Sequence, residues 1–180
     1  MERHQRGDIG SAEAHYRAIL SAVPQSIDAL HFLGLALAQR GAFDEGIGHL
    51  RQAVAMNPAV ADIKLNLAQA LMDSRDAVSA ISVCDSVIAL EAGNAKAWFI
   101  RGNALQLGGA HDQAVHSYDM ALRSAQDFAA ALNNKAHSLR LLRRSKEALE
   151  SLARALVLRP GYAMALNNRA TALVALKRFR

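Results

Sequence analysis

The chain repeats itself with a period of 34 residues. The stretch ALNNKA, which begins at Ala131, returns as ALNNRA at Ala165, and Pro24, Pro58 and Pro160 are separated by one or three such periods. Self-similarity at a period of about 20–50 residues is typical of arrays in which one supersecondary unit is stacked on the next. This period constrains the fold more strongly than the composition does.

The repeat boundaries follow when these prolines are placed in column 32 of a 34-column unit. The complete repeats are then residues 27–60, 61–94, 95–128 and 129–162, with partial repeats at 1–26 and 163–180. Two columns contain only glycine or alanine: column 8 holds Gly34, Ala68, Gly102, Ala136 and Ala170, and column 20 holds Ala12, Gly46, Ala80, Ala114 and Ala148.

Each repeat has the pattern of two helices. Columns 4, 7, 8 and 11 are spaced as one face of a helix, and columns 20, 24, 27 and 28 as one face of a second. Small residues in columns 8 and 20 let the two helices approach closely, and a turn is expected at column 15, which holds Gly7, Gly41 and Gly109. Ser26 and Asn94 are predicted N-caps, and proline in column 32 ends the second helix. The sequence therefore predicts an all-α fold of stacked helical hairpins, an α-solenoid.

Two repeats carry a fuller set of large and small residues at fixed columns. One has Trp98, Gly102, Leu105, Ala114, Tyr118 and Ala121, and the other has Leu33, Gly34, Leu37, Phe43, Leu50, Ala53 and Pro58. At a 34-residue spacing this pattern resembles the tetratricopeptide repeat, and the resemblance covers essentially all of residues 1–180. It implies a single array wound into a right-handed superhelix, with the first helices lining a concave groove.

Both ends of the sequence interrupt a repeat. Residue 1 falls in column 9 and residue 180 in column 18. Because stacked repeats need polar capping units at their ends, we expect the chain to be part of a longer array with a further hairpin after Arg180. Apolar surface on the terminal helices also leads us to expect self-association.

The face of each first helix that points away from its partner helix is the predicted binding surface. An asparagine amide has both donors and an acceptor, so a row of asparagines can pair with the backbone of a bound peptide whatever its side chains. The alternative is that these side chains are solvated or cap neighbouring helices. The predicted peptide-binding residues are Asn66, Gln69, Asn103, Asn133, Asn134, His137, Arg140, Asn167, Asn168 and Thr171.

The asparagines of column 6 add a narrower resemblance. Asn66, Asn134 and Asn168 are similar to the groove asparagines in the superhelical repeats of O-linked N-acetylglucosamine transferases, which implies a ladder that holds a substrate polypeptide. Phe32 and Ile100 interrupt this column. The resemblance implies an alternative to a simple interaction scaffold: the substrate-recognition region of a glycosyltransferase whose catalytic domain lies outside this sequence.

Nothing in the sequence resembles a catalytic or cofactor-binding motif. It contains no nucleophile elbow, P-loop or Rossmann glycine pattern. The seven histidines form no HExxH motif and no i,i+4 pair beside an acidic ligand. We therefore predict a protein-binding scaffold that is not an enzyme and uses no cofactor or metal. Cys84, the only cysteine, falls in a core column and is expected to be buried.

The charge is divided unevenly along the chain. Residues 1–128 carry 10 Lys and Arg against 14 Asp and Glu, whereas residues 129–180 carry 11 against 2. The basic end is either a solvated face or a surface that favours an acidic protein or peptide as partner. Nucleic acid is disfavoured because Arg143, Arg144 and Lys146 fall near a predicted turn, away from the groove face. No stretch is apolar enough for a membrane span or a signal peptide, so we predict a cytoplasmic protein without membrane attachment.

Overall fold

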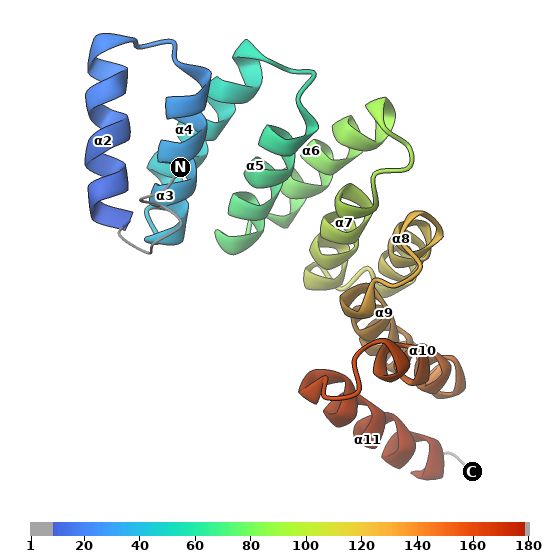
Figure 1. Ribbon diagram of the computed structural model, residues 1–180. Helices are drawn as coiled ribbons and strands as arrows, with labels where there is room; N and C mark the ends of the chain where they lie inside the picture. The colour runs from blue at the N-terminus through green and yellow to red at the C-terminus, as the bar shows by residue number, and fades with distance from the viewer. Residues whose placement is uncertain (1–8, 179–180) are drawn as a thin grey trace. The chain divides into compact units, whose positions relative to one another are not determined.

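The structure is a computed structural model that describes residues 9–178, and all regular elements in that range are α-helices. The predicted all-α fold is confirmed. The chain divides into two compact units between Leu90 and Glu91. The first unit contains α2 (Ile9–Ala22), α3 (Ile27–Gln39), α4 (Phe43–Met56), α5 (Ala61–Asp73) and α6 (Ala77–Leu90), and the second contains α7 (Ala95–Leu107), α8 (His111–Ser124), α9 (Ala129–Leu141), α10 (Ser145–Leu158) and α11 (Ala163–Arg178) (Figure 1).

The two helices of each complete hairpin are joined by a tight turn with one left-handed residue in column 15. Gly41 has φ +86° and Gly109 has φ +78°, which confirms the predicted turns, while Gly7 lies outside the described residues. Arg75 and Arg143 occupy the same column with φ 67° and 61°. These two turns therefore keep the same geometry without glycine, although a left-handed conformation costs a residue with a Cβ roughly 1–2 kcal/mol.

Side-chain caps start several helices. The Oγ of Ser26 accepts a hydrogen bond from the backbone N of Ala29 over 3.3 Å, and Oδ1 of Asn94 accepts one from the backbone N of Ala97 over 2.9 Å. Both predicted N-caps are confirmed. Proline is not needed to end the second helices, because α6 and α8 end in the same column as α4 and α10 without one.

Glycine allows the closest helix contacts, as columns 8 and 20 predicted. A Cβ on Gly34 would lie 2.8 Å from the carbonyl oxygen of Gly46, so α3 and α4 meet almost backbone to backbone. A Cβ on Gly102 would lie 2.5 Å from Cε1 of Tyr118, whose ring is fully buried between α7 and its neighbours. At both positions a larger residue would force the helices apart.

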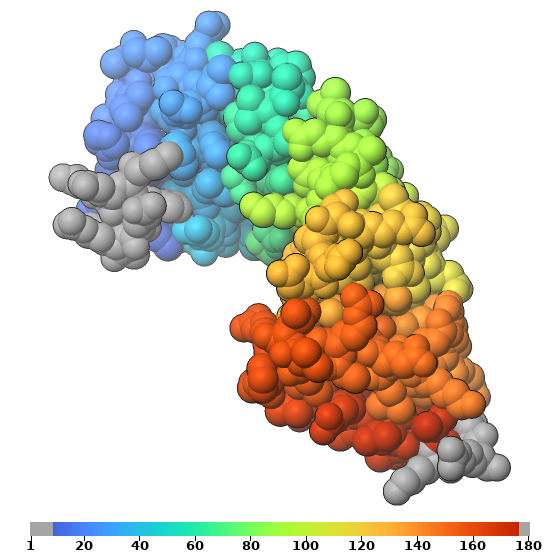
Figure 2. Space-filling view, turned by 45° about the vertical axis from the view of Figure 1, so that its right-hand side comes forward, coloured from blue at the N-terminus to red at the C-terminus, as the bar shows by residue number. Residues whose placement is uncertain are grey.

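First helices of successive repeats also touch within each unit. In the first unit α3 contacts α5, and in the second unit α9 contacts both α7 and α11. The space-filling view shows consecutive segments of each unit in direct contact in chain order (Figure 2). Side chains from α7, α9 and α11 can therefore contribute to one shared surface of the second unit.

Candidate functional site

The ten predicted binding residues are divided between the units. Asn66 and Gln69 lie on α5 in the first unit, and the other eight lie on α7, α9 and α11 in the second. Because α9 contacts both α7 and α11, the second unit has the larger continuous candidate site. We use the term amide face for its five asparagines, which are Asn103, Asn133, Asn134, Asn167 and Asn168.

A directional chain of hydrogen bonds crosses the amide face. Nδ2 of Asn168 on α11 donates to Oδ1 of Asn133 on α9 over 2.9 Å. Nδ2 of Asn133 donates to Oδ1 of Asn134 over 3.1 Å. Nδ2 of Asn134 donates in turn to Oδ1 of Asn103 on α7 over 2.9 Å. Each amide orients the next, so side-chain hydrogen bonds join the three first helices in addition to packing.

Tyr118 on α8 extends this chain into the core. Its hydroxyl lies 2.9 Å from Oδ1 of Asn103 and 3.1 Å from Oε1 of Gln106, which also accepts from Oγ of Ser138 over 3.0 Å. Burial raises the pKa of Tyr118, an effect that the amide of Asn134 opposes in smaller part. The phenol is therefore neutral and remains a hydrogen-bond donor.

Gln106, Tyr118 and Ser138 are members of this network that the repeat columns do not reveal. Helical spacing is the signal that could have found two of them. Gln106 follows Asn103 by one turn, and Ser138 follows Asn134 by one turn, so each pair lies on one side of its helix. Tyr118 is identifiable from sequence only as a core residue, because its ring packs against Gly102 while its hydroxyl reaches the amides.

Asn133 differs from the expectation that these asparagines are open to solvent. Its side chain lies against Asn168 and the residue is only 1% exposed, whereas Asn167, its counterpart one repeat later, is exposed. Asn103 and Asn134 are partly exposed. Asn103 uses its oxygen but not its Nδ2 in these hydrogen bonds, whereas the amide of Asn134 bonds to Asn103 and Asn133 and also to the hydroxyl of Tyr118. Asn103 therefore retains donor capacity for a ligand, and Asn134 retains a lone pair on Oδ1.

The repeat columns explain which amides pair. Asn168 in column 6 donates to Asn133 in column 5 of the preceding repeat, 35 residues earlier. Asn134 also occupies column 6, but the corresponding position in its preceding repeat is Phe99, which has no side-chain acceptor. Asn134 donates instead to Asn103, which stands in column 9 and one turn further along α7. A column 6 asparagine thus bonds to whichever acceptor the preceding first helix supplies.

The same column pairing occurs in the first unit. Nδ2 of Asn66 on α5 lies 2.7 Å from Nε2 of His31 on α3, again 35 residues earlier. Burial lowers the pKa of His31, and the carboxylates of Asp28 and Asp62 oppose this in smaller part. A neutral His31 ring accepts the hydrogen bond of Asn66 at Nε2 when its proton is on Nδ1.

Two predicted binding residues make contacts within their own helices. Nε2 of Gln69 donates to Oδ1 of Asp73 over 2.8 Å, and Oγ1 of Thr171 donates to the backbone oxygen of Asn167 over 3.0 Å. Both residues are exposed. Neither joins the inter-helix chain of amides. Gln69 keeps a second N–H, whereas Thr171 has already donated its single hydroxyl hydrogen and would have to rearrange to donate to a ligand.

His137 and Arg140 lie one turn apart on α9, directly after the amide face. Burial lowers the pKa of His137, and the positive charges of Arg140 and His111 lower it further. The lowered pKa favours the neutral ring of His137, so Arg140 carries the positive charge next to the amides at this end of α9. Both residues are among the predicted binding residues, and His111 of α8 lies near them in the structure.

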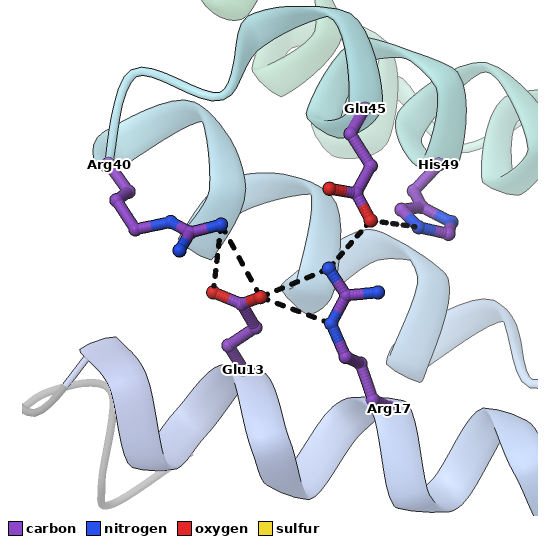
Figure 3. A network of polar contacts seen from close by, with 5 residues as sticks. All are labelled: Glu13, Arg17, Arg40, Glu45 and His49. Carbon is purple, nitrogen blue, oxygen red and sulfur yellow. Dashed lines mark hydrogen bonds and ion pairs between the residues drawn. The ribbon is translucent and has the colours of Figure 1, made fainter.

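A separate network of charged side chains lies in the first unit (Figure 3). Arg17 on α2 pairs with Glu13 over 3.0 Å and with Glu45 on α4 over 2.6 Å, and Arg40 at the end of α3 also reaches Glu13. His49 lies 3.9 Å from Glu45. The hydrogen bond from Arg17 lowers the pKa of Glu45. Exposed ion pairs contribute little to stability individually, and this network is best explained as a surface connection between α2 and the following hairpin.

The described residues give no structural support for other kinds of site. Between residues 9 and 178, no helix combines the length and the apolar character that crossing a bilayer requires. Among the side chains described there, no group of three or more His, Cys, Asp or Glu is arranged to hold a metal ion. Cys84 is buried, as its core column predicted.

Comparisons with known proteins identify what the chain resembles. A family model described as the tetratricopeptide repeat matches residues 3–50, 33–95 and 65–130, which together cover more than half of the chain. Among curated proteins, none matches the chain in sequence.

Solved structures show the same fold. The structure of MamA has a TM-score of 0.80 and 23% identity, covering 90% of this chain and 95% of that one. TTC0263 from Thermus thermophilus, a thermophilic TPR protein, has a TM-score of 0.75 and 22% identity over 96% and 94%. YrrB, described as a TPR protein with an unusual peptide-binding site, has a TM-score of 0.76 and 18% identity over 93% and 87%. At these identities the similarity shows the fold alone.

Proposed function

Since the chain belongs to the tetratricopeptide repeat family, we propose that it is a non-catalytic scaffold that binds an extended polypeptide segment on the amide face of its second unit. The fold is compatible with a protein-interaction scaffold. The observation that supports this particular surface is the row of hydrogen-bonded asparagines across α11, α9 and α7.

Hydrogen bonding among the asparagines orients their amides before a ligand arrives. A free asparagine loses rotamer freedom when it binds a partner, whereas one already held by a neighbour loses less. Asn103 keeps unused N–H groups, and Asn134 keeps a lone pair. A peptide unit presents one acceptor and one donor, so these groups can pair with backbone whatever the peptide's side chains are.

The spacing of the helices suits an extended peptide. Packed helices are about 8–10 Å apart, and an extended chain advances about 3.3 Å per residue. A peptide crossing from α7 over α9 to α11 would therefore meet a new first helix about every third residue. Each hydrogen bond contributes roughly 0.5–1.5 kcal/mol net, so two or three of them support weak, sequence-tolerant binding.

The alternative function places the same surface in a glycosyltransferase, as the region that holds the acceptor polypeptide. Its support is the column 6 pattern of Asn66, Asn134 and Asn168. In the structure these three asparagines bond to the preceding first helix rather than standing free, which weakens the comparison with a free ladder. A catalytic domain in the same reading frame would favour this alternative over a bare scaffold.

The proposed function is tested by binding to a random peptide library. Wild type is compared with Asn134→Ala and with Gln113→Ala, which removes an exposed amide from α8 in the same unit. Because Asn134→Ala also breaks two hydrogen bonds, helical content and Tm are measured first, and binding is measured where all three proteins are folded. We expect Asn134→Ala to weaken binding about fivefold to tenfold across unrelated peptides, and Gln113→Ala to have no effect. Absence of binding by wild type, or equal binding by all three, would contradict the proposal.

A further inference from the structure

The end of the amide face holds basic and ring nitrogens whose hydrogen-bonding capacity is not used. Nε of Arg140 and Nδ1 of His111 are both buried and have no hydrogen-bond partner. Arg140 lies on α9 and His111 is the first residue of α8, and these two helices pack together. His137, one turn before Arg140, is close enough to both for their charges to lower its pKa.

No acidic side chain among residues 9–178 is one of the groups that shift the pKa of His137. Nε of Arg140 has no hydrogen-bond partner in that range. The acid nearest in sequence to His111 is Asp112, which is exposed and acts electrostatically on Arg144 rather than on His137. The cluster therefore contains one permanent positive charge, on Arg140, and two buried nitrogens, Nε of Arg140 and Nδ1 of His111, without a hydrogen-bond partner from their own unit.

Unused buried donors are unusual and need an explanation. A buried donor without a partner loses its hydrogen bonds to water without replacement, and most such groups in folded proteins are satisfied by protein, water or ligand. The planar guanidinium of arginine presents paired N–H groups that match the two oxygens of a carboxylate. The ring of His137 or His111 can add a further N–H to the same anion.

We propose that Arg140, His137 and His111 form a subsite for a carboxylate side chain, aspartate or glutamate, of a polypeptide bound on the amide face. This inference rests on the proposed function, because it needs a peptide on that surface. His137 follows Asn134 by three residues on the same helix, so a backbone held at Asn134 carries a nearby side chain towards Arg140. The amide face then supplies sequence-independent affinity, and the basic subsite selects an acidic residue at one position.

The test uses peptides selected on the wild-type protein from a random library. Each selected peptide is also made with its Asp or Glu replaced singly by Asn or Gln. We expect one position at which the acidic form binds wild type about tenfold more tightly than the amide form. Arg140→Gln should abolish this preference, so that the acidic and amide forms of the peptide bind the variant with equal affinity. Arg154→Gln, which removes the same charge from an exposed position on α10, should retain the preference.

The outcomes separate this inference from the function on which it rests. If wild type binds library peptides but no acidic position matters, or if Arg140→Gln keeps the preference, the carboxylate subsite is wrong and peptide binding stands. If wild type binds no peptide, the proposed function fails and the subsite fails with it. The comparison of acidic and amide peptides uses the wild-type protein alone, so a folding defect in Arg140→Gln does not prevent it.

Discussion

Asn168 donates a hydrogen bond to Asn133 across 35 residues of sequence, and in doing so joins α11 to α9 by their side chains. The same step, from column 6 to column 5 of the preceding repeat, brings Asn66 to His31 in the first unit. Polar side chains in these columns therefore connect neighbouring repeats. In the second unit the connection continues through Asn134 to Asn103, which produces an oriented row of amides on one surface.

Asn133→Ala should destabilise the protein, because it removes the central link of this row. The change leaves Oδ1 of Asn134 and Nδ2 of Asn168 without these partners, and Asn133 itself is buried. We expect a loss of about 2–3 kcal/mol in the free energy of unfolding, measured by urea denaturation. Asn167→Ala, an exposed asparagine in the same column, should change it by less than about 0.5 kcal/mol. Equal effects of the two variants would contradict the assigned role of Asn133.

Gly102→Ala should also destabilise, although alanine is the better helix former. The new Cβ would lie 2.5 Å from Cε1 of the Tyr118 ring, which is fully buried. Overpacking of this kind costs about 1–3 kcal/mol, which exceeds the gain in helix propensity. Gly48→Ala in α4 is the matched control, because nothing lies within 4 Å of its Cβ. It should stabilise by about 0.5–1 kcal/mol in the same thermal or urea unfolding measurement.

Arg75→Gly should stabilise the first unit. Arg75 has φ 67° in the turn between α5 and α6, where glycine is unstrained. Relief of that strain exceeds the added entropy of the unfolded chain, so a gain of about 0.5–1 kcal/mol is expected in the free energy of unfolding. Arg75→Ala keeps the strain and should stay close to wild type. A glycine variant no more stable than the alanine variant would show that the arginine is not strained.

Stability should fall in mild acid through His31. Burial lowers its folded-state pKa below the usual 6.5, so the unfolded chain binds more protons as the pH falls below that value. The free energy of unfolding therefore decreases with falling pH from about 6.5 down to the folded-state pKa. Urea denaturation at about pH 7.5 and about pH 5.5 measures the decrease, which should be smaller in His31→Gln. An NMR titration of His31 with a pKa at or above 6.5 would contradict this assignment.

Most of the fold was predictable from the sequence because the repeat supplies many independent copies of the same information. The helix boundaries follow from the apolar columns, and the close helix contacts follow from glycine at positions such as Gly34 and Gly102. The turns at Arg75 and Arg143 were less evident, since a residue with a Cβ in a left-handed conformation gives no local signal. Their column, shared with Gly41 and Gly109, is the only indication.

The candidate site was predictable only in part. The columns place the asparagines on one surface, but they do not show that the amides bond to one another or that Asn133 is buried. Those features depend on the side chain that the preceding helix offers. Column 5 of the preceding repeat holds Phe99, which has no side-chain acceptor, and Asn134 donates to Asn103 instead. Only part of the basic cluster could be predicted from the sequence. The spacing of His137 and Arg140 places them on one helix face, whereas His111 joins them only because α8 packs on α9.

The central claim is that the amide face recognises the backbone of a bound polypeptide. The most direct test takes one peptide selected on the wild-type protein and replaces each backbone amide in turn by an ester, which removes one N–H and weakens one acceptor without changing any side chain. Binding affinity should fall at positions spaced about three residues apart, in step with the first helices. Ester scanning that leaves affinity unchanged at every position, while side-chain substitutions abolish binding, would contradict the claim.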